Sequence, residues 1–185
     1  MFNVKKLAFG AALLAASAVC FAAPKVEIVT SEGNIVVNLN EKAAPTTVAN
    51  FVKYANEGFY NGTIFHRVIN NFMIQGGGFD RNLHQKSTHA PIKLEDKNGL
   101  KNTGGTIAMA RTNNPDSATS QFFINLKDND FLNGTSTKDG YAVFGEVVSG
   151  MDVVRKIGRA PTGSKGFMDD VPVRPVIIES VKVLK

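Results

Sequence analysis

Tryptophan is absent from the 185-residue sequence, and its single cysteine, Cys20, lies near the N-terminus. A chain with one thiol cannot form an internal disulfide, and if the N-terminal segment is removed, a catalytic cysteine is excluded as well. Basic residues outnumber acidic ones, 21 to 16, but the lysines are scattered rather than clustered. Such a distribution gives little support to nucleic-acid binding. Linkers, internal repeats and low-complexity tracts are also missing, which favours a single domain.

Residues 1–23 have the pattern of a cleavable signal peptide. Lys5 and Lys6 supply a positive start, residues 7–19 are apolar apart from Ser17, and small residues before Pro24 offer cleavage sites. The apolar run is shorter than the ~20 residues of a membrane-spanning helix, which argues against the alternative of an uncleaved anchor. We therefore expect a protein secreted to the periplasm, with no stable membrane association.

Removal of residues 1–23 would also remove Cys20, the only cysteine. A lipid-modified Cys20 is a weaker alternative, because Val19 precedes it where lipoproteins have a Leu-Ala-Gly pattern. The mature chain, residues 24–185, then has no thiol. Without Lys5 and Lys6 it has 19 basic residues against 16 acidic ones, a net charge of +3. This is ordinary for one soluble domain with a full core, and we take a monomer as the default.

The mature chain is rich in short β-type segments and poor in helical ones. Apolar residues at helical spacing predict two helices, one from Pro45 to a stop at Gly58 and one over 150–157. Residues 80–102 and 161–175 are predicted as loops. Many short strands without a βαβ rhythm predict a mainly β protein, an antiparallel barrel. The runs predicted as strands are 26–29, 35–39, 65–69, 72–75, 140–145 and 176–183.

Two hypotheses for small-ligand sites have weak support. His66, His84 and His89 lack close metal-ligand spacing, and no acidic or thiol partner is placed to complete a tetrahedral site, so no metal is expected. The triple glycine 76–78 is not followed by the Lys-Ser/Thr pair of a phosphate loop, and bends close to a packed surface explain it better.

Two stretches carry the functional signal. Residues 65–79 predict a strand, an Asn-Asn turn and a second strand, in which Arg67 shares a face with Ile69 and Met73 with Gln75. Residues 104–125 offer similar groups. Together the blocks resemble the signatures of the cyclophilins, which are peptidyl-prolyl cis-trans isomerases, over the chain from about Val26 to the C-terminus. The blocks are Phe65-His66-Arg67-Val68-Ile69, Phe72-Met73-Ile74-Gln75-Gly76-Gly77, Gly105-Thr106-Ile107-Ala108-Met109-Ala110 and Ser120-Gln121-Phe122-Phe123-Ile124.

The resemblance implies a closed eight-stranded antiparallel β-barrel, filled by side chains and capped by two α-helices. It also implies a reaction that requires no cofactor. Rotation about a peptide bond faces a barrier of ~18–20 kcal/mol because of resonance. A catalyst needs to hold the proline, let the flanking carbonyl turn, and bind the twisted state more tightly than the planar one. Proline-containing and unfolded exported polypeptides are the expected partners.

Roles for individual residues follow from this chemistry and from the resemblance. Arg67 can donate to the prolyl nitrogen, which accepts well only when resonance is broken, and Gln75 can hold the rotating carbonyl. The apolar socket for the proline ring is expected from Phe72, Met73, Phe123 and Leu132. By resemblance, the backbone of Ala110 and Arg111 and the side chain of Gln121 fix the substrate main chain.

The sequence departs from the best-known eukaryotic cyclophilins at the pocket. Phe131 stands where they have tryptophan, Tyr141 where they have histidine, and Arg111 where asparagine is usual. Both aromatic residues still close the pocket, so we expect isomerase activity, but weak cyclosporin binding, since cyclosporin binding in the family depends on that tryptophan. With the signal peptide, these residues resemble the bacterial periplasmic branch.

Two other functions remain as alternatives. A module or chaperone could grip proline-containing segments without useful catalysis, and Arg67 discriminates, because binding alone tolerates its loss whereas breaking resonance does not. A barrel carrying a small hydrophobic ligand is disfavoured, because the named side chains suit a surface groove.

Overall fold

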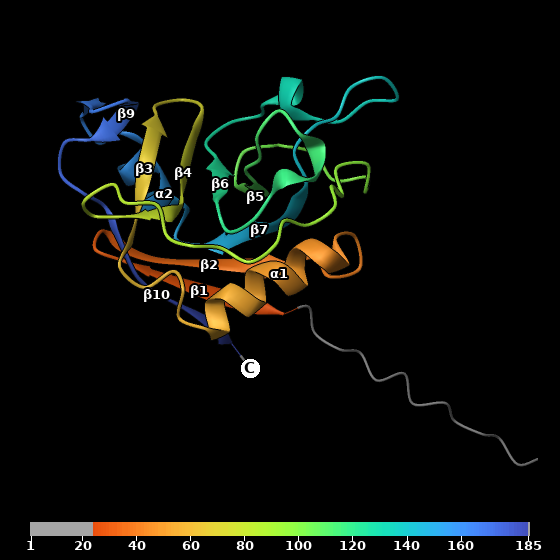
Figure 1. Ribbon diagram of the computed structural model, residues 1–185, viewed down its shortest axis with the longest axis horizontal. Helices are drawn as coiled ribbons and strands as arrows, with labels where there is room; N and C mark the ends of the chain where they lie inside the picture. The colour runs from red at the N-terminus through yellow and green to blue at the C-terminus, as the bar shows by residue number, and fades with distance from the viewer. Residues whose placement is uncertain (1–23, 185) are drawn as a thin grey trace, which may run out of the picture.

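The computed structural model describes residues 24–184, so the predicted signal peptide lies outside the described residues. Eight strands close into an antiparallel barrel in the order β1-β10-β3-β4-β6-β5-β7-β2 (Figure 1), which confirms the predicted fold. The barrel strands are β1 (Lys25–Thr30), β2 (Gly33–Leu39), β3 (Thr63–Ile69), β4 (Met73–Asp80), β5 (Thr106–Met109), β6 (Phe122–Asn125), β7 (Val143–Ser149) and β10 (Ile177–Leu184).

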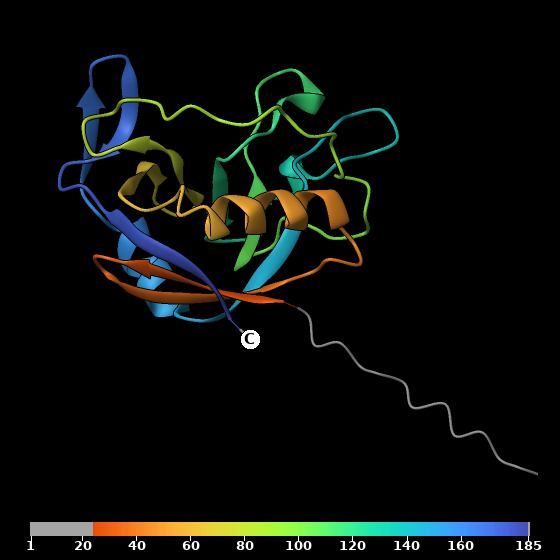
Figure 2. The same ribbon diagram turned by 60° about the horizontal axis from the view of Figure 1, so that its bottom comes forward.

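Two α-helices, α1 (Pro45–Asn56) and α2 (Met151–Gly158), pack on different sides of the barrel (Figures 1 and 2). Ala44 has no side chain that can cap α1, and a distant carboxylate does this instead. Glu95 accepts hydrogen bonds from the amides of Thr46 and Thr47 at 3.1 and 2.8 Å. The loop over 80–102, predicted as surface, is therefore tied to the first turn of α1. Among the described residues, no helix has the length and apolar character needed to cross a membrane.

The barrel interior is filled by aromatic and branched side chains. Phe51 enters from α1, and its ring lies 5.1 Å from Tyr60, 5.4 Å from Phe122 and 5.2 Å from Phe144, centroid to centroid. All four rings are fully buried. Burial of such rings contributes a large share of the free energy of folding, and the packing leaves the interior occupied by the protein's own atoms.

Two of the predicted segments need correction. Residues 161–175, predicted as a loop, contain a hairpin of β8 (Thr162–Lys165) and β9 (Met168–Pro172), which lies beside β3 (Figure 1). All four residues of β8 are exposed, so this strand has no apolar alternation from which it could be predicted. The strand predicted over 140–145 begins only at Val143, because Gly140 and Tyr141 are held in an irregular segment.

Candidate active site

Strand register places a row of side chains across the outer face of the barrel. Arg67 of β3 pairs with Gln75 of β4, Gln75 with Phe123 of β6, Phe123 with Ala108 of β5, and Ala108 with Val143 of β7. Neighbouring strands lie ~4.8 Å apart, so residues paired in this way stand side by side on one face. The row brings together groups that come from five different strands.

A pocket of about 230 Å³ opens over this row. Met73 and Phe123 form its floor and are only 2% and 4% exposed. The pocket brings together nine of the eleven residues predicted for the site. Its lining residues are Arg67, Phe72, Met73, Gln75, Ala110, Arg111, Phe123, Leu132 and Tyr141.

The two remaining predicted residues border the pocket. Phe131 stacks on Phe72 with ring centroids 5.6 Å apart and is 60% exposed, so it extends the apolar wall outwards. Gln121 accepts a hydrogen bond from Gln75, Nε2 to Oε1, at 3.0 Å. The Gln121 side chain crosses β4 directly above Gly78, where a Cβ atom would lie 2.4 Å from Gln121 Cγ. That glycine therefore makes room for the amide pair.

Arg67 is, with Arg111, one of the two charged residues that line the pocket. Its Nε lies 3.9 Å from Asp170 Oδ2, and both side chains are nearly half exposed. The neighbouring His66 is 6% exposed, its ring lies 4.6 Å from that of Phe79, and its buried Nδ1 has no hydrogen-bond partner among residues 24–184. Burial, and secondarily the Arg67 charge, lowers the pKa of His66 to about 4, so its imidazole is neutral near pH 7.

Sequence reasoning missed two contributions to the site. Asp170 comes from β9, in a segment predicted as loop and far from Arg67 along the chain. Arg111 was predicted to act through its backbone, yet its guanidinium forms hydrogen bonds with neighbouring loops. No local pattern predicts either contact, because both join segments that are separate in the sequence.

The arrangement combines an apolar floor with donors at one edge. Met73 and Phe123 supply the apolar floor, and the Arg67 guanidinium and the Gln75 amide line the pocket beside them. The histidines lie apart: His84 pairs with Asp80 and His89 with Glu57, both outside the pocket. Within the part of the chain that the structure describes, no three His, Cys, Asp or Glu side chains are grouped to hold a metal ion.

A family model and several known proteins match this chain over most of its length. Residues 25–183 match the family model "Cyclophilin type peptidyl-prolyl cis-trans isomerase/CLD". A peptidyl-prolyl cis-trans isomerase of Acinetobacter baylyi is 56% identical over 180 residues, covering 97% of this chain and 96% of that protein. Peptidyl-prolyl cis-trans isomerase B of Escherichia coli is 61% identical over 157 residues, covering 83% and 96%.

Solved structures of cyclophilin-type isomerases have the same fold as this chain. A cyclophilin-type isomerase of Cryptosporidium parvum superposes with a TM-score of 0.73 at 26% identity, covering 88% of this chain and 98% of that one. The same protein has also been solved in the presence of the dipeptide Ala-Pro.

Proposed function

Because the chain belongs to the cyclophilin-type peptidyl-prolyl cis-trans isomerases, we propose that it accelerates rotation of Xaa-Pro bonds in exported proteins and thereby assists their folding in the periplasm. The isomerase activity follows from the family and from relatives 54–61% identical to this chain. The place of action and the class of substrate are the proposal. They are supported by the signal-peptide pattern of residues 1–23, with Lys5 and Lys6 before the apolar run.

The observation that carries the mechanism is the pairing of Arg67 with Gln75 beside the apolar floor. When the Xaa-Pro bond twists, the prolyl nitrogen regains its lone pair and becomes a hydrogen-bond acceptor. The Arg67 guanidinium is the donor for this nitrogen. Because planar substrate offers no such acceptor, the hydrogen bond forms only in the transition state and lowers the barrier.

The other residues hold the substrate around the turning bond. The proline ring is held by four apolar side chains, those of Phe72, Met73, Phe123 and Leu132. The pocket is closed by two aromatic rings, those of Phe131 and Tyr141. Gln75 holds the carbonyl that rotates, and its hydrogen bond from Nε2 to Gln121 sets the orientation of both amides. The backbone of Ala110 and Arg111 and the Gln121 side chain position the main chain. Proline-containing polypeptides are therefore the partners, in keeping with the structure of the Cryptosporidium protein solved in the presence of the dipeptide Ala-Pro.

The experiment for the proposed location follows the full-length chain in a Gram-negative host. Cells are separated into periplasm, cytoplasm and membrane, and the intact mass of the protein is measured in each fraction. We expect a periplasmic species that has lost about the first 23 residues, with a monomeric mass in solution. A full-length species in the membrane or cytoplasm would contradict the proposal. It would leave the isomerase activity, which is assayed separately on a short Xaa-Pro peptide, unaffected.

A further inference from the structure

The wall of the pocket formed by Tyr141 belongs to an irregular segment, not to a strand. Tyr141 follows Gly140, and β7 begins only at Val143. The Tyr141 ring meets Phe123 edge to face, with centroids 5.6 Å apart and planes at 80°. The strand β7 therefore stops short of this ring, and an interaction of the irregular segment has to help hold it.

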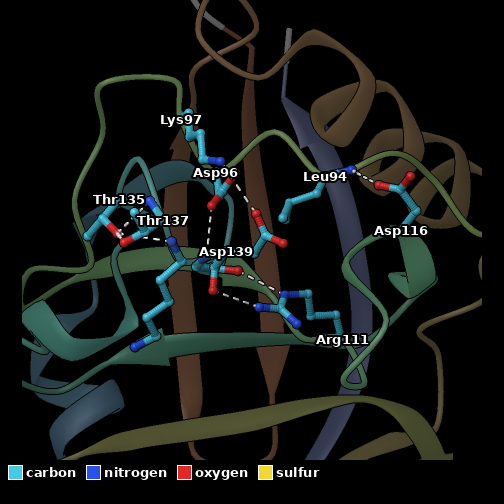
Figure 3. A network of polar contacts seen from close by, with 10 residues as sticks. Leu94, Asp96, Lys97, Arg111, Asp116, Thr135, Thr137 and Asp139 are labelled. Atoms are coloured by element: carbon cyan, nitrogen blue, oxygen red, sulfur yellow. Dashed lines mark hydrogen bonds and ion pairs between the residues drawn. The ribbon is translucent and has the colours of Figure 1, made fainter.

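Arg111 supplies that interaction with its side chain. Nε donates to the carbonyl of Gly140 at 2.8 Å, Nη2 to the carbonyl of Asp139 at 3.0 Å, and Nη1 to the carbonyl of Thr112 at 2.8 Å. Figure 3 shows the guanidinium directed at the Asp139 segment. Its Cζ also lies 4.7 Å from the centroid of the Tyr141 ring. The planar guanidinium holds its donors in a fixed fork and can stack flat on a ring, a geometry that neither an asparagine amide nor a lysine ammonium offers.

The same peptide segment is held from its other side. Asp96 Oδ2 accepts a hydrogen bond from the amide of Gly140 at 2.7 Å, and Lys97 pairs with Asp139 at 3.4 Å (Figure 3). A Cβ on Gly140 would lie 2.6 Å from the carbonyl oxygen of Leu132, so the segment is also pressed against a second pocket residue. The Tyr141 amide donates to that same carbonyl at 2.9 Å.

We propose that the Arg111 side chain is a positioning residue for the isomerase pocket: it clamps residues 139–141 and so fixes the Tyr141 ring against Phe123. This role differs from the backbone contact with substrate that the family resemblance implies for the same position. It depends on the isomerase activity of the chain and is independent of whether the protein is exported. Because the Tyr141 wall contacts substrate in both ground and transition state, its displacement raises KM more than it lowers kcat.

The test compares Arg111→Gln, Arg111→Lys and wild type in the mature chain with an Xaa-Pro peptide. We expect kcat/KM to fall about tenfold in Arg111→Gln, largely through KM, and Arg111→Lys not to restore it, since a single ammonium nitrogen does not reproduce the three donor positions of the planar fork. Arg81→Gln removes the same charge outside the pocket and serves as the matched control. Arg67→Ala in the same assay shows separately that the activity comes from the pocket.

A double-mutant cycle with Tyr141→Leu separates the clamp from direct substrate contact. If Arg111 acts through the ring, Arg111→Gln has little further effect once the ring is gone. Full activity in Arg111→Lys, or effects of Arg111→Gln and Tyr141→Leu that simply multiply, would overturn the proposal in favour of direct contact. Unchanged activity in Arg111→Gln would overturn it entirely.

A spectroscopic measurement covers the case in which Arg111→Gln is poorly folded. The sequence has three tyrosines, of which Tyr54 and Tyr60 are fully buried in the core. In protein with isotope-labelled tyrosine rings, Arg111→Gln and the independent variant Asp96→Ala should both shift the NMR signal of the Tyr141 ring. The signals of the Tyr54 and Tyr60 rings should stay in place. If neither variant moves the Tyr141 signal, or if all three signals move together, the clamp does not exist as described.

Discussion

The inner and outer faces of the same three strands do different work in this protein. On β4, β5 and β6, side chains alternate so that Ile74, Ile107 and Phe122 point into the barrel. Their neighbours Met73, Ala108 and Phe123 form a second, smaller cluster on the outside. The inner residues are sealed on every side, whereas the outer cluster is bordered by half-exposed residues and carries the pocket.

The difference shows how a filled barrel can still bind a substrate. The interior, closed by aromatic contacts around Phe51 and Phe122, holds the strands rigid. Rigid strands keep the register of Arg67, Gln75 and Phe123, and register is what brings these groups together. Side chains on rigid strands can be held closely enough to discriminate a transition state from a ground state. The inner face thus supplies most of the packing, and the outer face carries the pocket in which we propose that the chemistry takes place.

Substitution of the adjacent residues Phe122 and Phe123 should separate the roles of the inner and outer faces most clearly. Phe122→Ala leaves a sealed cavity beside the rings of Phe51, Tyr60 and Phe65, and we expect a loss of about 3–5 kcal/mol in the free energy of unfolding. Phe123→Ala enlarges a pocket that is already open, so we expect a smaller loss of stability but a larger loss of kcat/KM. Urea denaturation and peptide isomerisation measure the two quantities. Equal destabilisation, with activity retained in Phe123→Ala, would contradict the division between the faces.

His66 and Arg67 differ in exposure in the same way as the two faces: His66 is buried, whereas its neighbour Arg67 is nearly half exposed. With a native pKa of about 4, His66 stays neutral while the unfolded chain takes up a proton below its ordinary pKa of about 6.5. The protein therefore loses stability as pH falls between these two values, by about 2–3 kcal/mol in all. In His66→Gln, which lacks the titrating group, this part of the pH dependence of urea denaturation should disappear. An unchanged pH dependence would show that other groups cause it.

A smaller effect, on the affinity for cyclosporin, is expected at Phe131 on the exposed rim of the pocket. Phe131 carries no hydrogen-bond donor where the eukaryotic cyclophilins have an indole N–H, and we expect weak cyclosporin binding for this reason. Phe131→Trp should tighten binding about tenfold, the equivalent of one hydrogen bond, with isomerase activity retained. Calorimetric titration of both proteins with cyclosporin measures this. Equal affinities would show that the missing donor is not the cause.

The sequence predicted the outer row well because strand alternation is a local property. Arg67 with Ile69, and Met73 with Gln75, follow from period-two spacing, and the resemblance supplied the partners on β6. The contacts of Asp170 and of the Arg111 side chain were not predictable in this way. They join segments through tertiary packing, and the exposed strand β8 carries no apolar pattern that would have placed its hairpin next to Arg67.

We propose that Arg67 makes the outer face a catalyst and not merely a binding surface. The most direct measurement is cis-to-trans exchange of a short Xaa-Pro peptide by the mature chain, with Arg67→Ala and the control Arg81→Ala alongside. We expect Arg67→Ala to lose about 10²–10³ in kcat/KM while its thermal unfolding stays that of wild type. Retention of activity in Arg67→Ala, or peptide binding by the wild type without acceleration, would contradict the account and favour a proline-binding module.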